Sequence, residues 1–87
     1  MEGYLKKHLN VFKGWKQRYF ILHEDILVYS EEKGGKLLGQ MHLKVCSIQQ
    51  SKDDVLLILI NSGTKELKIK AKDINEKVKW INALQQA

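Results

Sequence analysis

The spacing of apolar residues changes once along this chain, close to its end. Before that point, short segments rich in aromatic and β-branched residues alternate with polar turns, which is typical of antiparallel strands. After it, the apolar residues recur at helical spacing: Ile74, Val78, Ile81 and Leu84, with Trp80 beside them. Asp73 precedes this run and Glu76 lies three residues further on, a relationship typical of a helix N-terminus. We therefore expect a mainly β domain closed by one amphipathic helix of about three turns.

The segments before the helix predict about seven short strands. They lie at residues 3–8, 15–22, 26–29, 39–45, 46–50, 55–60 and 67–71. The clearest hairpin turn is Asn61-Ser62-Gly63-Thr64, between the last two of these strands. A small antiparallel sheet system whose open end is covered by the helix accommodates this order.

The length of the chain predicts one domain, residues 1–87. Cys46 is the only cysteine, so no intrachain disulfide can form, which fits a reducing cytoplasmic compartment. The longest apolar run, residues 55–60, is too short to span a bilayer, and residues 1–7 contain no apolar stretch of signal-peptide length. We expect a monomer whose contact with a membrane, if any, is peripheral.

Positive charge is concentrated at the front of the chain. The formal net charge is +5, and residues 1–22 carry five cations against one carboxylate. A localised positive field favours an anionic partner, such as a lipid headgroup, a nucleic acid or an acidic peptide. Nucleic acid is the least favoured of these, because Trp15, Tyr19 and Trp80 are predicted in the core and leave no exposed stacking array.

Catalytic and metal-binding patterns are missing from the sequence. The histidines, His8, His23 and His42, lack metal-ligand spacing, and the acidic pairs at 24–25, 31–32 and 53–54 are adjacent residues in turns. No serine lies in a nucleophile-elbow context, and no glycine-rich phosphate loop precedes a helix. We therefore expect a binding module that is not an enzyme and needs no cofactor or metal.

Three cations flank the first predicted hairpin. Lys7 ends one strand, and Lys16 and Arg18 alternate onto one face of the next, so the hairpin brings all three to the mouth of one loop. Arg18 offers a planar fork of donors and the lysines offer mobile charges, which is the chemistry a phosphate monoester requires. Alternatively, these residues are ordinary solvated surface charges.

The loop between these strands carries three apolar residues, Leu9, Val11 and Phe12. If their side chains are exposed, they can enter the acyl boundary of a bilayer, and with the neighbouring cations they form a two-signal anchor. The alternative is that Leu9 or Phe12 folds back onto the core.

Two segments carry a family resemblance. Gly3-Tyr4-Leu5-Lys6-Lys7, followed by Trp15-Lys16-Gln17-Arg18-Tyr19-Phe20-Ile21-Leu22 and by Trp80 in the last helix, resembles a pleckstrin homology (PH) domain. The resemblance implies a seven-stranded, partly open barrel of two near-orthogonal antiparallel sheets, capped by one C-terminal helix.

The loop Asn10-Val11-Phe12-Lys13-Gly14-Trp15 is similar to that of the PH domains of oxysterol-binding protein, the ceramide transfer protein and the four-phosphate adaptor proteins. That subgroup implies recognition of phosphatidylinositol 4-phosphate on the cytosolic face of Golgi membranes. The sequence departs from the subgroup at His8 and Leu9, where the subgroup has Trp-Thr, and at Leu38, where it usually has a basic residue.

The resemblance also implies roles for single residues. Lys7 and Arg18 match phosphate ligands, Tyr29 matches a position that donates its hydroxyl to a phosphate, and His42 matches a position that is often basic. Lys36 can substitute for the cation missing at Leu38. The alternative function is a protein-interaction module on the same fold, with weak or no lipid binding.

Overall fold

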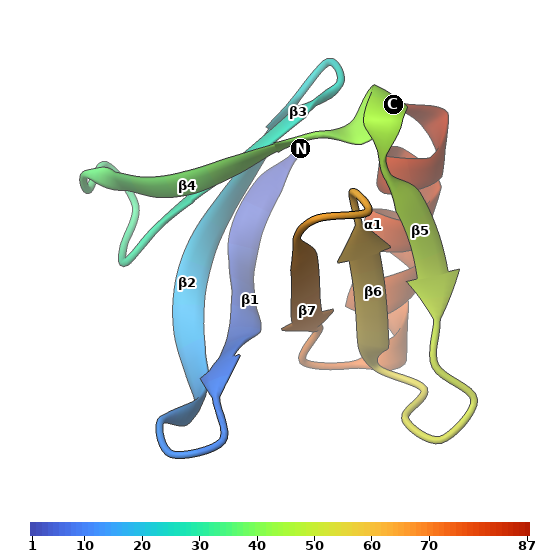
Figure 1. Cartoon of the computed structure of the whole chain (residues 1–87), viewed down its shortest axis with the longest axis horizontal. Coiled ribbons are helices and arrows are strands. Elements are labelled where there is room, and N and C mark those ends of the chain that lie inside the picture. The colour runs from blue at the N-terminus through green and yellow to red at the C-terminus, as the bar shows by residue number, and fades with distance from the viewer.

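A computed structural model describes residues 1–87 as seven strands followed by one helix (Figure 1). The strands are β1 (Glu2–Asn10), β2 (Gly14–His23), β3 (Ile26–Ser30), β4 (Leu37–His42), β5 (Ser47–Gln50), β6 (Leu57–Asn61) and β7 (Glu66–Lys70). A short 3-10 helix, η1 (Leu43–Val45), separates β4 from β5, and the chain ends with α1 (Ile74–Gln86). This confirms the predicted β domain with a C-terminal helix. No helix of the chain is long and apolar enough to cross a membrane.

All neighbouring strands are antiparallel, in the order β4-β3-β2-β1-β7-β6-β5. The sheet bends where β1 meets β7, because these strands pair only at Lys6–Lys70 and Lys7–Ile69. Figure 1 shows the two halves that result, β1–β4 on one side and β5–β7 on the other. We call this two-pair junction the seam.

One core of fifteen buried residues joins both halves and the helix. Leu5 and Phe20 enter it from β1 and β2, Ile58 and Ile69 from β6 and β7, and Trp80 from α1. Because side chains alternate along each strand, one face of each half-sheet, β1–β4 and β5–β7, packs against the same interior.

The buried face of α1 differs from the predicted one. Lys77, Trp80, Ile81 and Leu84 are buried, whereas Ile74 and Val78 are each 48% exposed. Asp73 caps the helix by accepting a hydrogen bond from the Glu76 backbone nitrogen at 2.8 Å, as expected. The bulk of Trp80 and the aliphatic stem of Lys77, whose ammonium donates to Gln50 Oε1, occupy the interior side, so Val78 turns outward.

The predicted strand at residues 39–45 was also misplaced. The structure begins β4 at Leu37 and ends it at His42. The 3-10 turn of η1 then ends the strand alternation, so that Leu43 is buried but Val45 is 71% exposed instead of sharing its face. The 61–64 hairpin turn is confirmed, since Asn61 Oδ1 accepts from the Gly63 nitrogen at 2.6 Å and the Ser62 nitrogen donates to the Lys65 carbonyl at 2.9 Å.

The antiparallel order brings three connections to one end of the molecule. These are the loops at residues 11–13, 31–36 and 62–65, which follow β1, β3 and β6. β1 ends and β2 begins at this end of the molecule, so the inward side chains near the end of β1 and the start of β2 lie beside these loops.

Candidate functional site

The pairing of β1 and β2 continues the core face outward as a row of cations. Leu5 pairs with Arg18 and Lys7 pairs with Lys16, and paired residues in an antiparallel ladder share a face. Leu5 is almost fully buried, so Arg18, Lys7 and Lys16 lie on the inward face, and the Lys7–Lys16 pair is closer to the loop than Arg18. The structure therefore brings together the three cations that the hairpin pattern predicted.

Arg18 holds the deepest charge of this cluster. Its Nη1 donates to the Gln17 carbonyl at 2.9 Å, but its Nε is buried and has no hydrogen-bond partner. Leaving a buried donor unsatisfied costs about 1–3 kcal/mol, and native structures contain few such groups. The guanidinium thus keeps an unused donor within the row of inward-facing cations.

A fourth cation, Lys65, influences the pKa of Lys7. Burial lowers the pKa of Lys7, and the positive charges of Lys65 and Arg18 lower it further. Lys65 follows the 62–64 turn and was not predicted as a site residue, because the sequence does not show that β7 pairs with β1. None of Lys7, Lys16, Arg18 and Lys65 forms an ion pair with a carboxylate. Their mutual repulsion favours an anion between them.

Tyr29 lies on the same inward face, opposite Phe20 of β2. The Lys7 ammonium lies 5.3 Å from the centroid of its ring. Burial raises the pKa of Tyr29 while the charge of Arg18 opposes the rise, so the phenol remains a hydrogen-bond donor at neutral pH. We call Lys7, Lys16, Arg18, Lys65 and Tyr29 the cationic mouth.

The loop beyond the cationic mouth presents bare apolar side chains. Val11 is 83% exposed and Phe12 95% exposed, whereas Leu9 is half-buried at the base of the loop. Asn10 Oδ1 accepts hydrogen bonds from the backbone nitrogens of Phe12 and Lys13, at 2.9 and 2.8 Å. The positive φ of Gly14 (65°) completes the turn. Val11 and Phe12, the apolar tip, therefore do not fold back onto the core.

Two predicted ligands lie elsewhere. His42 ends β4 at the end of the molecule opposite the 11–13 loop. It points outward because Gly39, three residues earlier, faces inward toward Tyr29. Lys36 lies in the loop after β3, in a hollow that Glu31 and Glu32 also line. These carboxylates disfavour a phosphate beside Lys36. The structure therefore does not bring His42 or Lys36 into the cationic mouth.

Comparisons with known proteins cover the whole chain. The family model described as PH domain matches residues 1–87. The human pleckstrin homology domain-containing family A member 8 is 37% identical over 93 residues, covering 100% of this chain, which spans 18% of that relative's length.

Two solved structures have the same fold. The C-terminal PH domain of pleckstrin in complex with D-myo-Ins(1,2,3,5,6)P5 has a TM-score of 0.89 and 32% identity, with 100% of this chain and 92% of that chain covered. The PH domain of human oxysterol-binding protein-related protein 11 has a TM-score of 0.86 and 28% identity, with 98% and 76% covered.

Proposed function

Because this chain belongs to the PH domain family, we propose that it is a membrane-targeting module that binds a phosphoinositide headgroup in the cationic mouth. The observation that carries the proposal is the buried, unpartnered Nε of Arg18 beside Lys7, with no carboxylate paired to either residue. A phosphate monoester supplies the acceptor oxygens and the negative charge that these groups lack.

Phosphatidylinositol 4-phosphate is the lipid we propose. The likeness to the oxysterol-binding protein subgroup in the 10–15 loop supports this choice, and it favours the cytosolic face of Golgi membranes as the place of binding. A related domain, the C-terminal PH domain of pleckstrin, has been solved in complex with an inositol pentakisphosphate, which supports a polyphosphorylated ring as the class of ligand.

Binding proceeds in three steps. The positive charge concentrated in residues 1–22 steers the domain to an anionic leaflet. Arg18 and Lys7 then hold the headgroup phosphate, with Lys16, Lys65 and the Tyr29 hydroxyl around it. Finally the apolar tip enters the boundary between headgroups and acyl chains, where burial of Phe12 contributes about 1.5–3 kcal/mol. Each cation near the membrane surface adds about 1 kcal/mol, so the cationic mouth and the apolar tip together hold the domain on the membrane.

Liposome co-sedimentation at physiological salt tests the proposal. Vesicles that differ only in phosphoinositide identity are compared, with the wild-type chain, Arg18→Gln and the matched variant Lys44→Gln. Lys44 is an exposed cation whose ammonium lies 3.8 Å from Asp25, outside the cationic mouth. We expect selective binding to vesicles with the 4-phosphate, and its loss in Arg18→Gln by roughly tenfold or more, as for a charge-assisted bond.

Two outcomes would contradict the proposal. Equal weakening by Arg18→Gln and Lys44→Gln would mean general electrostatic attraction without a headgroup site. No binding to any vesicle would favour the protein-interaction function that the same fold can serve.

A further inference from the structure

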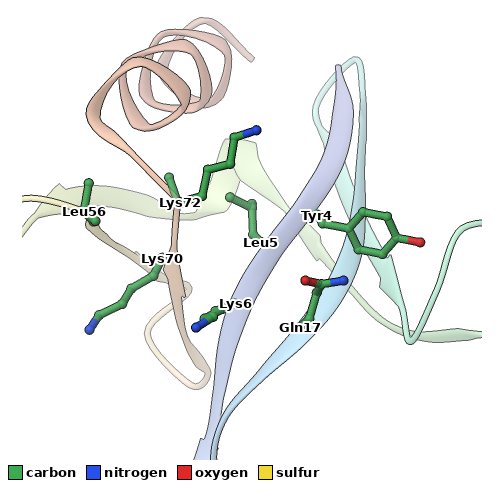
Figure 2. A pocket seen from close by; sticks show the side chains of 8 residues that line it. Tyr4, Leu5, Lys6, Gln17, Leu56, Lys70 and Lys72 are labelled. Atoms are coloured by element: carbon green, nitrogen blue, oxygen red, sulfur yellow. The ribbon is translucent and has the colours of Figure 1, made fainter.

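A second basic feature lies on the outer face of the sheet, along the seam. A groove of about 360 Å³ opens where β1 and β7 diverge (Figure 2). Its lining carries three lysines, Lys6, Lys70 and Lys72. The apolar part of the lining is Leu56 and the exposed Tyr4, together with the buried core residues Leu5 and Ala71. We call it the lysine groove. None of these residues belongs to the cationic mouth.

The lysine groove and the cationic mouth lie on opposite faces of β1. Lys6 and Lys7 are consecutive residues of the strand, so their side chains point to opposite faces. Lys7 faces inward, where its ammonium lies over the Tyr29 ring, and Lys6 is exposed on the outer face. A ligand in the groove therefore leaves the mouth free.

The charges of the groove are largely unneutralised. Lys70 pairs with Asp54 at 2.7 Å and its ammonium lies 4.7 Å from the Trp15 ring centroid, so it is fixed in place. Lys6 and Lys72 are exposed and make no ion pair, and no acidic residue lines the groove. Figure 2 shows Lys6 and Lys70 near one end and Lys72 toward the helix at the other.

The shape and chemistry of the groove fit a peptide better than an inositol ring. Half of the eight lining residues are apolar, and a sugar phosphate offers no apolar group to cover them. Lys70 ends β7, and Lys72 lies two residues later in the bend that leads to α1, so the two lysines line the groove at separate points. Carboxylates on either side of an apolar residue can therefore meet both lysines while that residue covers the apolar part of the groove.

We propose that the lysine groove binds an extended acidic peptide segment with an apolar anchor residue, and that it does so while the cationic mouth holds lipid. Charge complementarity with the lysines sets the orientation of the segment, and burial of the anchor against Leu56 and Tyr4 supplies apolar contact. The segment belongs to a partner protein at the same membrane.

Fluorescence anisotropy with a labelled ten-residue peptide, four glutamates flanking a central leucine, tests the proposal. The variants are Lys6→Glu/Lys72→Glu and the charge-matched control Lys44→Glu/Lys79→Glu, whose lysines lie in η1 and on α1. We expect the first to weaken binding roughly tenfold or more and the control to leave it within about twofold. A peptide with alanine in place of leucine should bind roughly tenfold more weakly.

A chemical-shift titration of the wild-type domain tests the location without any variant. Addition of the peptide should shift the backbone amide signals of Lys6, Gln17 and Lys72, and saturating inositol 1,4-bisphosphate should not displace the peptide. Displacement by that headgroup, or equal weakening by both double variants, would overturn the proposal. So would an absence of peptide binding combined with loss of vesicle binding in Lys6→Glu/Lys72→Glu, which would assign the groove to lipid.

Discussion

The ring of Tyr29 lies directly against the backbone of Gly39, its partner across β3 and β4. A Cβ atom at position 39 would lie 2.5 Å from the Tyr29 hydroxyl and 2.7 Å from the carbon that bears it. Only glycine leaves room for the tyrosine to reach the cationic mouth in this rotamer. The identity of residue 39 therefore determines where a phenol on the neighbouring strand can lie.

Gly39→Ala should displace Tyr29 and destabilise the domain by about 1–3 kcal/mol, the usual cost of overpacking. Chemical denaturation measures the change. Gly3→Ala is the matched control, because a Cβ there meets only Trp80, at an ordinary 3.8 Å. If the two variants unfold at the same denaturant concentration, the contact with Tyr29 does not constrain position 39.

Lys65→Ala should weaken binding to vesicles that carry phosphatidylinositol 4-phosphate by about fivefold, the worth of one cation near the surface. Lys68→Ala removes the same charge from a residue that pairs with Glu66 at 3.8 Å, and should change binding less. Removal of Lys65 should also raise the pKa of Lys7, since the Lys65 charge lowers it. Lysine side-chain NMR titration measures that pKa directly. An unchanged pKa of Lys7 would mean that Lys65 does not belong to the site.

Phe12→Ser should weaken membrane binding by roughly tenfold or more while it leaves binding of soluble inositol 1,4-bisphosphate and the unfolding free energy unchanged. The reason is that Phe12 is 95% exposed and contributes only when a bilayer covers it. Val45→Ser is the control, because Val45 is exposed in η1, outside the loop. Loss of soluble headgroup binding in Phe12→Ser would show that Phe12 shapes the mouth instead of entering the bilayer.

Stability should fall in alkaline solution through Tyr19. The Tyr19 hydroxyl donates to the Glu2 carboxylate, and this bond, with burial and the Glu2 charge, raises the pKa of Tyr19 to about 12. An unfolded tyrosine titrates near pH 10, so the contribution is complete below about pH 10 and is lost as the pH rises through about 12. Urea denaturation from pH 9 to 12 should show a smaller decline in Tyr19→Phe. An identical decline in both proteins would exclude Tyr19 as its source.

The loss of stability caused by a substitution on α1 should depend on whether the residue lies on the observed buried face. Ile81→Gln should cost about 2 kcal/mol or more, because it removes buried apolar atoms and buries an amide. Val78→Gln, only three residues earlier, should change stability by less than about 0.5 kcal/mol because Val78 is half-exposed. Thermal unfolding followed by circular dichroism compares the two. A larger loss in Val78→Gln would contradict the assigned orientation of the helix.

The sequence predicted what depends on local pattern. The 61–64 turn, the Asp73 cap and the inward row of Lys7, Lys16 and Arg18 follow from side-chain chemistry and the two-residue period of a strand. The orientation of α1 was wrong at Val78 because apolar spacing cannot weigh Trp80 and the stem of Lys77 against it. Lys65 was missed because its position depends on which strand β7 joins, a long-range pairing that no local pattern records.

His42 also shows that a local sequence pattern does not determine where a side chain points. Its family match placed it in the pocket, but the alternation from Gly39 turns it outward, and η1 follows it immediately. The exposure of Phe12 depends on Asn10, whose side chain accepts two backbone hydrogen bonds and shapes the loop. A resemblance in sequence gives the position of a residue along a strand, whereas its face depends on every residue before it.

The seam has a consequence for how the domain comes apart. Two residue pairs are too few to hold two half-sheets together through their backbones, so the joint depends on the side chains of both halves and the helix meeting in one core. Neither half keeps an interior of its own once the other leaves. Unfolding should therefore be a single cooperative transition, with amide hydrogens on both sides of the bend exchanging through the same global opening.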